Sequence, residues 1–132
     1  MVTSYTLGNL SQEFDRIFSS HHATSTYPPY NVLRFGEDEY VMEFAVAGFK
    51  KDEISIKTDK NVLSITGEKS EREFSEGDGY LHKGIAARKF SRSFTLPEYV
   101  EVSRAGMEDG ILYVNLIRNI PEEKKPKQIS IS

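Results

Sequence analysis

The 132-residue chain contains no cysteine, and this absence removes several kinds of chemistry at once. A disulfide framework, a zinc site with cysteine ligands and a thiol nucleophile are all excluded, and such a chain suits a reducing interior. The N-terminus lacks the basic segment and apolar run of a secretory signal, and no stretch approaches the roughly 18 apolar residues that span a bilayer. We therefore expect a cytoplasmic protein that does not enter a membrane.

Positive charge is also scarce. Lys and Arg number 17 against 20 Asp and Glu, which gives a net charge of -3, and the basic residues are scattered among acidic ones. Such a chain has no cationic field to attract nucleic acid, so nucleic acid is a poor candidate partner. The composition, 38% hydrophobic and 28% charged, is typical of a soluble domain, and the length suits one domain with extensions.

The residues for catalysis are equally sparse. The histidines, His21, His22 and His82, are not joined by an HExxH helix that could complete a zinc site. The segment "GEKS" at 67–70 resembles the end of a phosphate-binding loop, but no glycine lies five positions earlier, and no G-x-S-x-G elbow occurs. We expect no cofactor, no metal and no enzyme activity. A hydrolase whose carboxylates meet only on folding stays open as a minor alternative.

Residues 1–26, rich in Ser, Thr, Asn and His, predict an N-terminal arm outside the domain. Within the arm, apolar residues recur at the spacing of one helix face, at Leu10, Phe14, Ile17 and Phe18. Ser11 can cap this helix. Isolated helices below about 12 to 15 residues are marginal in water, so the stripe needs a partner surface.

The domain begins at residue 27, where Pro28 and Pro29 forbid a helix and hold the chain extended. From there to residue 118, short stretches alternate apolar and polar residues between turns, among them "EISIK", "VLSITGE", "RKFSRSFTLP" and "ILYVNLI". Gly110 fits a turn with positive φ before the last stretch. Short, regular strands without a long helical pattern predict an all-β fold, an antiparallel immunoglobulin-like β-sandwich.

One long polar loop, residues 68–85, interrupts this pattern. Glycines in the loop frame a small apolar island, Tyr80 and Leu81. Structureless loops of this length are uncommon in compact domains and usually have a function. The island therefore suggests a strand that pairs with another chain.

The segment 119–132 reads as a semi-rigid linker with an apolar endpiece. Ile129 and Ile131 lie two positions apart, which places both side chains on one face of an extended strand. The arm, the loop and the tail thus each carry apolar residues outside the core pattern. They could fold back on their own domain, but docking onto another molecule is the better hypothesis.

Several motifs resemble those of the small heat shock proteins, the α-crystallin-type chaperones of the Hsp20 family, and are nearest the bacterial inclusion-body-binding class. They are "YPPYN" at the domain start, "AVAGFKKDEI" at 45–54, "GIAARKFSRSFTLP" at 84–97, A-x-x-x-x-G-I-L at 105–112, and I-x-I at 129–131. The resemblance covers about residues 27–131, with a looser "FDRIF" in the arm. Five motifs in the right order make chance similarity improbable.

The resemblance implies a holdase that binds unfolding proteins without ATP and works as a dynamic oligomer of dimers. The dimer would form by swapping a strand of the long loop into the partner's sheet, which implies an interface containing Tyr80, Leu81, Gly84 and Arg92. Arg92 also shares the parity of Phe90 and Phe94, so it should face inward or toward a partner and need a carboxylate there.

The resemblance also implies that Ile129 and Ile131 insert into a groove of a neighbouring sandwich. Its expected lining is Ile54, Ile56, Ala105 and Met107. Clients would bind the apolar residues of the arm, Leu7, Leu10, Phe14, Ile17 and Phe18. Partners would be unfolding proteins, further copies of the chain and, as an open possibility, ATP-dependent refolding chaperones.

Two rival functions remain. A monomeric β-sandwich that serves as a co-chaperone or protein-binding module would not require the I-x-I endpiece. A membrane-surface protein could use the arm's stripe, but that helix has almost no basic residues to hold anionic lipid.

Overall fold

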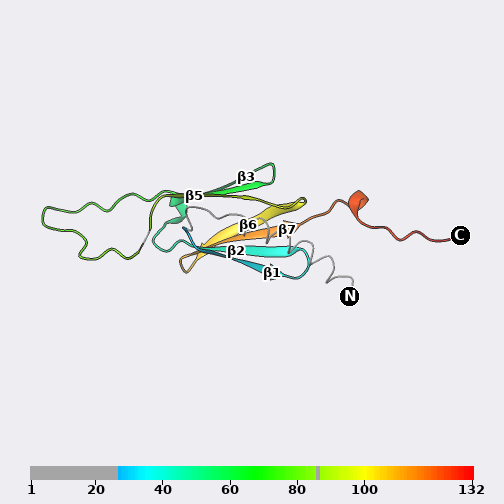
Figure 1. Cartoon of the computed structure of the whole chain (residues 1–132), viewed down its shortest axis with the longest axis horizontal. Coiled ribbons are helices and arrows are strands. Elements are labelled where there is room, and N and C mark those ends of the chain that lie inside the picture. The colour runs from blue at the N-terminus through cyan, green and yellow to red at the C-terminus, as the bar shows by residue number, and fades with distance from the viewer. Residues whose placement is uncertain (1–26, 86) are drawn as a thin grey trace.

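The computed structural model describes residues 27–85 and 87–132, which form two antiparallel sheets packed face to face (Figure 1). One sheet has the strand order β1-β2-β7-β6 and the other β3-β4-β5. The strands are β1 (Tyr30–Phe35), β2 (Glu39–Ala45), β3 (Ile54–Asp59), β4 (Val62–Gly67), β5 (Phe90–Thr95), β6 (Val100–Glu108) and β7 (Ile111–Arg118). The predicted all-β antiparallel sandwich is confirmed.

The core follows from strict alternation in the central strands, because successive side chains of a strand point to opposite faces of the sheet. In β2 and β7 every second residue is buried and the residues between them face outward. The buried apolar side chains of the two inner faces include Tyr40, Met42, Phe44, Leu63, Ile65, Phe90, Phe94, Leu112, Val114 and Leu116.

Aromatic contacts show which strands face one another across the sandwich. The ring of Phe94 in β5 lies 5.3 Å from that of Tyr30 in β1 and 5.9 Å from that of Phe44 in β2. β5 therefore lies over β1 and β2. Since packed sheets keep their strands roughly aligned, β3 and β6, the strands at the other ends of their sheets, lie on the opposite side of the sandwich.

Tight turns hold the register of the hairpins. Asp109 and Gly110 between β6 and β7 have φ values of 54° and 76°, and Lys60 and Asn61 between β3 and β4 have 48° and 57°. Positive φ at both central residues is the pattern of two-residue hairpins whose twist matches that of the strands. The positive φ predicted at Gly110 is confirmed.

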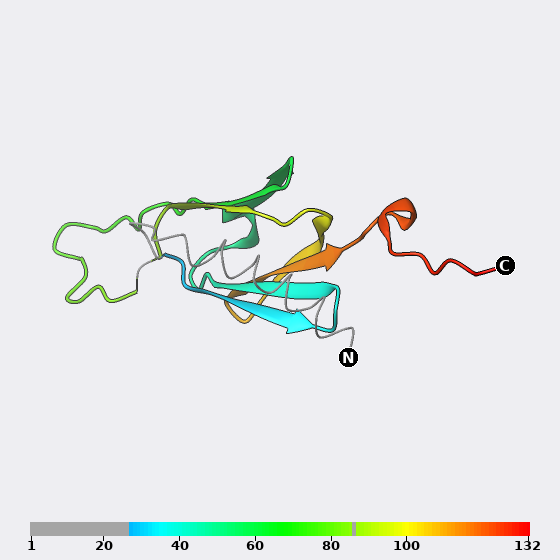
Figure 2. The same cartoon turned by 45° about the vertical axis from the view of Figure 1, so that its right-hand side comes forward.

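Two segments extend beyond the sandwich at opposite ends (Figures 1 and 2). The loop 68–85 follows β4 on the way to β5 and projects from the end where β4 finishes. The C-terminal tail leaves β7 at the other end, makes a single 3-10 turn at Glu122–Lys124 and continues without regular structure.

Candidate interaction surfaces

The inward face of β3 supplies half-buried aliphatic side chains at an edge of the sandwich. Ile54 and Ile56 pack against the core but are not enclosed by it, whereas Ile65, opposite Ile56 in β4, is fully buried. Within the described residues β3 hydrogen-bonds only to β4, so the outer edge of β3 presents unpaired backbone groups. Such an edge is a template for further contacts.

β6 forms the corresponding edge of the other sheet, and a bulge alters which of its residues point inward. The pairing with β7 shifts between Val102 and Arg104, which leaves Ser103 as an extra residue. On either side of this bulge, Val102, Ala105 and Met107 lie opposite buried residues of β7. All three therefore share the inward face, with Ala105 exposed and the other two half-buried.

The structure thus brings all the expected groove residues onto the inward faces of two edge strands on one side of the sandwich. Val102 belongs to the same set and was missed, because simple alternation back from Ala105 leads to Ser103 instead. The signal was present, since Val100 and Val102 alternate with the opposite parity to Ala105 and Met107. A change of parity within one strand indicates a bulge.

The tail does not fold back onto these strands. Ile129 is 84% exposed and Ile131 is 99% exposed, and the tail runs away from the sandwich (Figure 1). Their spacing in an extended segment puts both side chains on one face. In the single chain, the two isoleucines of the endpiece are therefore not covered by the sandwich. The groove on a neighbouring chain that was expected to receive them stays a prediction.

The long loop exposes an aromatic cluster. The rings of Phe74 and Tyr80 meet edge to face at 5.2 Å, with Arg72 and Lys83 lying 5.7 and 5.4 Å from the centre of the Tyr80 ring. Tyr80 is half exposed and Leu81 is fully exposed. Gly84 also lies in this loop, which contains no strand in the single chain, so the expected swapped strand remains a prediction.

Arg92 is buried within its own chain, where it meets different partners from those expected. Its guanidinium donates a hydrogen bond from Nη1 to the carbonyl oxygen of Pro28 at 3.2 Å. It also lies 5.1 Å from the ring of Tyr30 and 5.4 Å from that of Phe94. Among the described residues these contacts take the place of the expected carboxylate, because a weakly hydrated planar cation can stack on aromatic rings.

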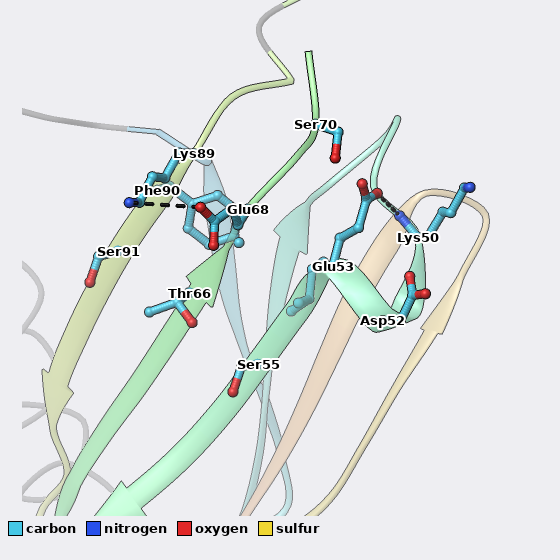
Figure 3. A pocket seen from close by; sticks show the side chains of 12 residues that line it. Lys50, Asp52, Glu53, Ser55, Thr66, Glu68, Ser70, Lys89, Phe90 and Ser91 are labelled. Carbon is cyan, nitrogen blue, oxygen red and sulfur yellow. Dashed lines mark hydrogen bonds and ion pairs between the residues drawn. The ribbon is translucent and has the colours of Figure 1, made fainter. Parts of the chain in front are cut away.

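A hollow of about 800 Å³ lies at the end of the β3-β4-β5 sheet where β3 and β5 begin and β4 ends (Figure 3). A row of hydroxyl groups crosses it, from Ser55, Thr66 and Ser91 on neighbouring strands. Lys89 Nζ lies 3.9 Å from a carboxylate oxygen of Glu68, and Glu53 Oε1 accepts a hydrogen bond from the backbone N–H of Lys50 at 2.7 Å. The charged side chains that line the hollow are two lysines, Lys50 and Lys89, and three carboxylates, Asp52, Glu53 and Glu68, so the lining has a slight excess of negative charge.

The "GEKS" segment ends at this hollow and is not a phosphate-binding loop. Gly67 is the last residue of β4, and a Cβ at this position would meet the ring of Phe90. The glycine thus allows close packing beneath an aromatic side chain. Among residues 27–85 and 87–132, no group of three or more His, Asp or Glu side chains is placed to hold a metal ion. The client-binding residues expected at Leu7, Leu10, Phe14, Ile17 and Phe18 lie outside the described part of the chain.

No helix in the described residues is both long and apolar enough to cross a membrane.

Sequence comparisons agree with this architecture. The chain matches the model of the Hsp20/alpha crystallin family over residues 33–132. It is 43% identical over 124 residues to small heat shock protein HspD of Bradyrhizobium diazoefficiens, a match that covers 90% of this chain and 80% of the relative. It is 39% identical over 123 residues to small heat shock protein IbpA of Pectobacterium carotovorum, covering 89% of this chain and 88% of the relative.

Solved structures give the same result. A C-terminally truncated small heat shock protein AgsA from Salmonella typhimurium is 35% identical, with a TM-score of 0.64 over 79% of this chain and 98% of that one. The small heat shock protein of Synechococcus phage S-ShM2 is 32% identical, with a TM-score of 0.62 over 80% of this chain and 99% of that one. The predicted resemblance is confirmed by sequence and by fold, and the chain belongs to the Hsp20/alpha crystallin family of small heat shock proteins.

Proposed function

We propose that this chaperone is an ATP-independent holdase, which binds unfolding proteins and keeps them from aggregating, and that it works as a dynamic oligomer of dimers. The observation that carries the proposal is the set of apolar side chains outside the sandwich, at Leu81 in the loop and at Ile129 and Ile131 in the tail, all almost fully exposed. Exposed apolar groups of this kind mark sites of protein contact.

The loop would build the dimer. An extended segment around Tyr80 and Leu81 can add a strand to the sheet of a second copy, since β1 pairs only with β2 among the described residues and leaves one edge open. Such an addition would also remove an edge that is an aggregation hazard. Gly84 lies near the end of the same segment. Arg92 would support the interface from β5, the strand that follows the loop in sequence.

The tail would join dimers into larger assemblies. Ile129 and Ile131 would insert between β3 and β6 of a neighbouring chain, next to the half-buried side chains of Ile54, Ile56 and Met107 and the exposed Ala105. Both partners of this contact present apolar groups that the single chain leaves incompletely covered. Burial of those groups is the driving force.

Clients would be captured by apolar contact, without catalysis, on the arm residues Leu7, Leu10, Phe14, Ile17 and Phe18. The proposed organisation is therefore an arm at 1–26, a sandwich domain at 27–118 and a linking tail at 119–132. Release of captured clients to ATP-dependent refolding chaperones would complete the cycle, since holding alone does not refold a protein.

The test is the heat-induced aggregation of a thermally labile enzyme, followed by light scattering without ATP. Scattering should be suppressed when the chaperone subunits are in excess, and a curve equal to that of a buffer control would refute the holdase. Size exclusion coupled to light scattering addresses the alternative, a monomeric binding module. A single species at the chain mass of 15.0 kDa at micromolar concentration would favour that alternative.

A further inference from the structure

The outer face of the β1-β2-β7-β6 sheet carries an apolar cluster that neither the loop nor the tail explains. Leu33 and Phe35 of β1, Val41 of β2 and Ile117 of β7 all point away from the core, because their strand neighbours are the residues that face inward. Phe35 is 55% exposed and the other three are half-buried. We call these four residues the outer-face cluster.

The strand register brings the four residues close together on the outer face, with Glu39 between Phe35 and Ile117. Leu33 lies opposite Val41, and Phe35 lies opposite Glu39, which in turn lies opposite Ile117. Phe35, Val41 and Ile117 line one hollow of about 410 Å³, which is in the size range of a binding pocket and is also lined by the polar residues Glu39, Ser103, Arg104 and Asn115. A lining of this mixed kind can accept an amphipathic segment, whose apolar side chains would cover Phe35, Val41 and Ile117.

The other sheet has an outer face of different chemistry. The outward residues of β5, which are Ser91, Ser93 and Thr95, are hydroxyl-bearing and exposed, and Ser64 and Thr66 continue the same pattern on β4. An antiparallel sheet commonly keeps one polar, solvated face, and the β3-β4-β5 sheet does so. The apolar cluster on the opposite sheet departs from this pattern and indicates a covered face.

The N-terminal arm is the segment whose length and attachment fit this face. Residues 1–26 join the described chain at Tyr27, next to the start of β1, and β1 itself carries Leu33 and Phe35. The residues between Phe18 and Tyr27 can span at most about 30 Å, whereas β1 is only about 17 Å long. The arm's apolar stripe can therefore reach any part of the cluster on its own chain.

The proposed tail and loop contacts leave the outer face free for the arm. The tail would occupy the edges of β3 and β6, and the loop would add to a sheet edge by backbone hydrogen bonds, so neither covers the side chains of the outer face. The arm needs a partner surface because a helix of its length is marginal alone.

We propose that the arm packs in cis on the outer-face cluster, with the stripe of Leu10, Phe14, Ile17 and Phe18 over the hollow at Phe35, Val41 and Ile117. Arm and sheet then cover each other's apolar residues while no client is present. Release of the arm would expose both surfaces together. This consequence rests on the proposed holdase function, whereas the packing itself does not.

The chain contains no tryptophan, so a single introduced one reports on the arm without background. In full-length protein with Phe14→Trp, the indole should emit at short wavelength and resist quenching by acrylamide. Adding Phe35→Lys should shift the emission to the red and raise the quenching constant to that of a free peptide with the arm's sequence. Phe35 is already half exposed, so this substitution leaves the sandwich folded, which circular dichroism checks.

Ser93→Lys is the matched control, because it places the same side chain at an exposed position on the opposite outer face. It should leave the emission unchanged. If Phe35→Lys unfolds the domain, Ile117→Lys on β7 repeats the test. An indole that is exposed in the Phe14→Trp parent, or shielded equally with and without the lysine, would overturn the inference.

Two further measurements distinguish packing of the arm on its own chain from packing of the arm on a second copy. Shielding that persists in the tail-deficient protein with Leu81→Asp, which is expected to be a monomer, supports packing within one chain. Shielding that disappears on dilution, or on removal of residues 128–132, overturns it in favour of a contact between copies. Failure of the chain to suppress aggregation would refute the holdase while leaving the fluorescence result unaffected, so the two proposals fail separately.

Discussion

Replacing Ile129 and Ile131 together with alanine should reduce the assembly to dimers while leaving the sandwich folded. Both side chains are exposed in the single chain, at 84% and 99%, and contact no part of its core. Their removal therefore costs the domain no packing. Size exclusion with light scattering should show a main species at twice the chain mass of 15.0 kDa, with an unchanged melting temperature.

The expected size of the effect follows from opposing terms. Burial of two isoleucines contributes roughly 3 to 6 kcal/mol, at about 1.5 to 3 each. Ordering the linker costs about 1 to 2 kcal/mol for each residue that becomes fixed. Part of the linker is already ordered, since Lys125 N donates to the carbonyl oxygen of Glu122 at 3.2 Å and their side chains form an ion pair at 3.3 Å.

The net free energy of a single proposed tail contact is thus close to zero, and the proposed assembly would depend on many tails acting together through effective concentration. The segment from Arg118 to Ile129 can reach at most about 40 Å, which is enough to cross to a neighbouring dimer. Subunit exchange should accordingly be fast compared with unfolding of the sandwich. The wild-type oligomer should also become smaller on dilution.

Matched variants sharpen the test. Ser130→Ala with Ser132→Ala changes alternate residues of the same endpiece and should keep the full oligomer mass. Ile56→Lys in the edge strand β3 should shrink the assembly as the tail variant does, and combining the two should add little, because they disrupt one contact. A tail variant that retains the wild-type mass would refute the reasoning.

Three further predictions concern the domain and the dimer. Arg92→Met should lower the free energy of unfolding by about 1 to 3 kcal/mol, since it leaves the buried Pro28 carbonyl without its donor; a change below about 0.5 kcal/mol in urea titration would contradict this. Gly67→Ala should cost about 1 to 3 kcal/mol because the Phe90 ring must move, whereas Gly79→Ala, with no atom near its Cβ, should cost less. Leu81→Asp in the tail-deficient background should convert dimers to monomers in light scattering, and a persistent dimer would exclude the loop from the interface.

Most of the fold could be predicted from the alternation of apolar and polar residues along the strands. Leu63 and Ile65 in β4, and Leu112, Val114 and Leu116 in β7, stand at every second position and are buried in the structure. The pattern is direct because a strand with one face on the core must repeat with a period of two. Gly110 was predictable for a similar reason, since a two-residue hairpin needs positive φ.

Other features depend on contacts that periodicity does not encode. The bulge at Ser103 changes which residues of β6 face inward, so a period of two carried back from Ala105 leads to Ser103 and misses Val102, whose pairing with Leu116 shows that it faces inward. Arg92 was expected to need a carboxylate, but within the described part of the single chain its hydrogen bond goes to residue 28 and one of its two ring contacts to residue 30, both far away in sequence. The outer-face cluster escaped notice because its residues are divided among three strands and become neighbours only through the register.

The loop and the tail leave the sandwich at opposite ends, and this placement has a consequence for growth of the assembly (Figures 1 and 2). In the language of polymer chemistry, a subunit with a self-pairing group at one end and a weak linking group at the other is a bifunctional monomer. A dimer of such subunits carries two tails and two grooves that accept tails, which makes four possible links to other dimers. A single closed ring of dimers would use fewer links than that. Small changes in the direction of the linker would then select between closed shells of different sizes and open networks.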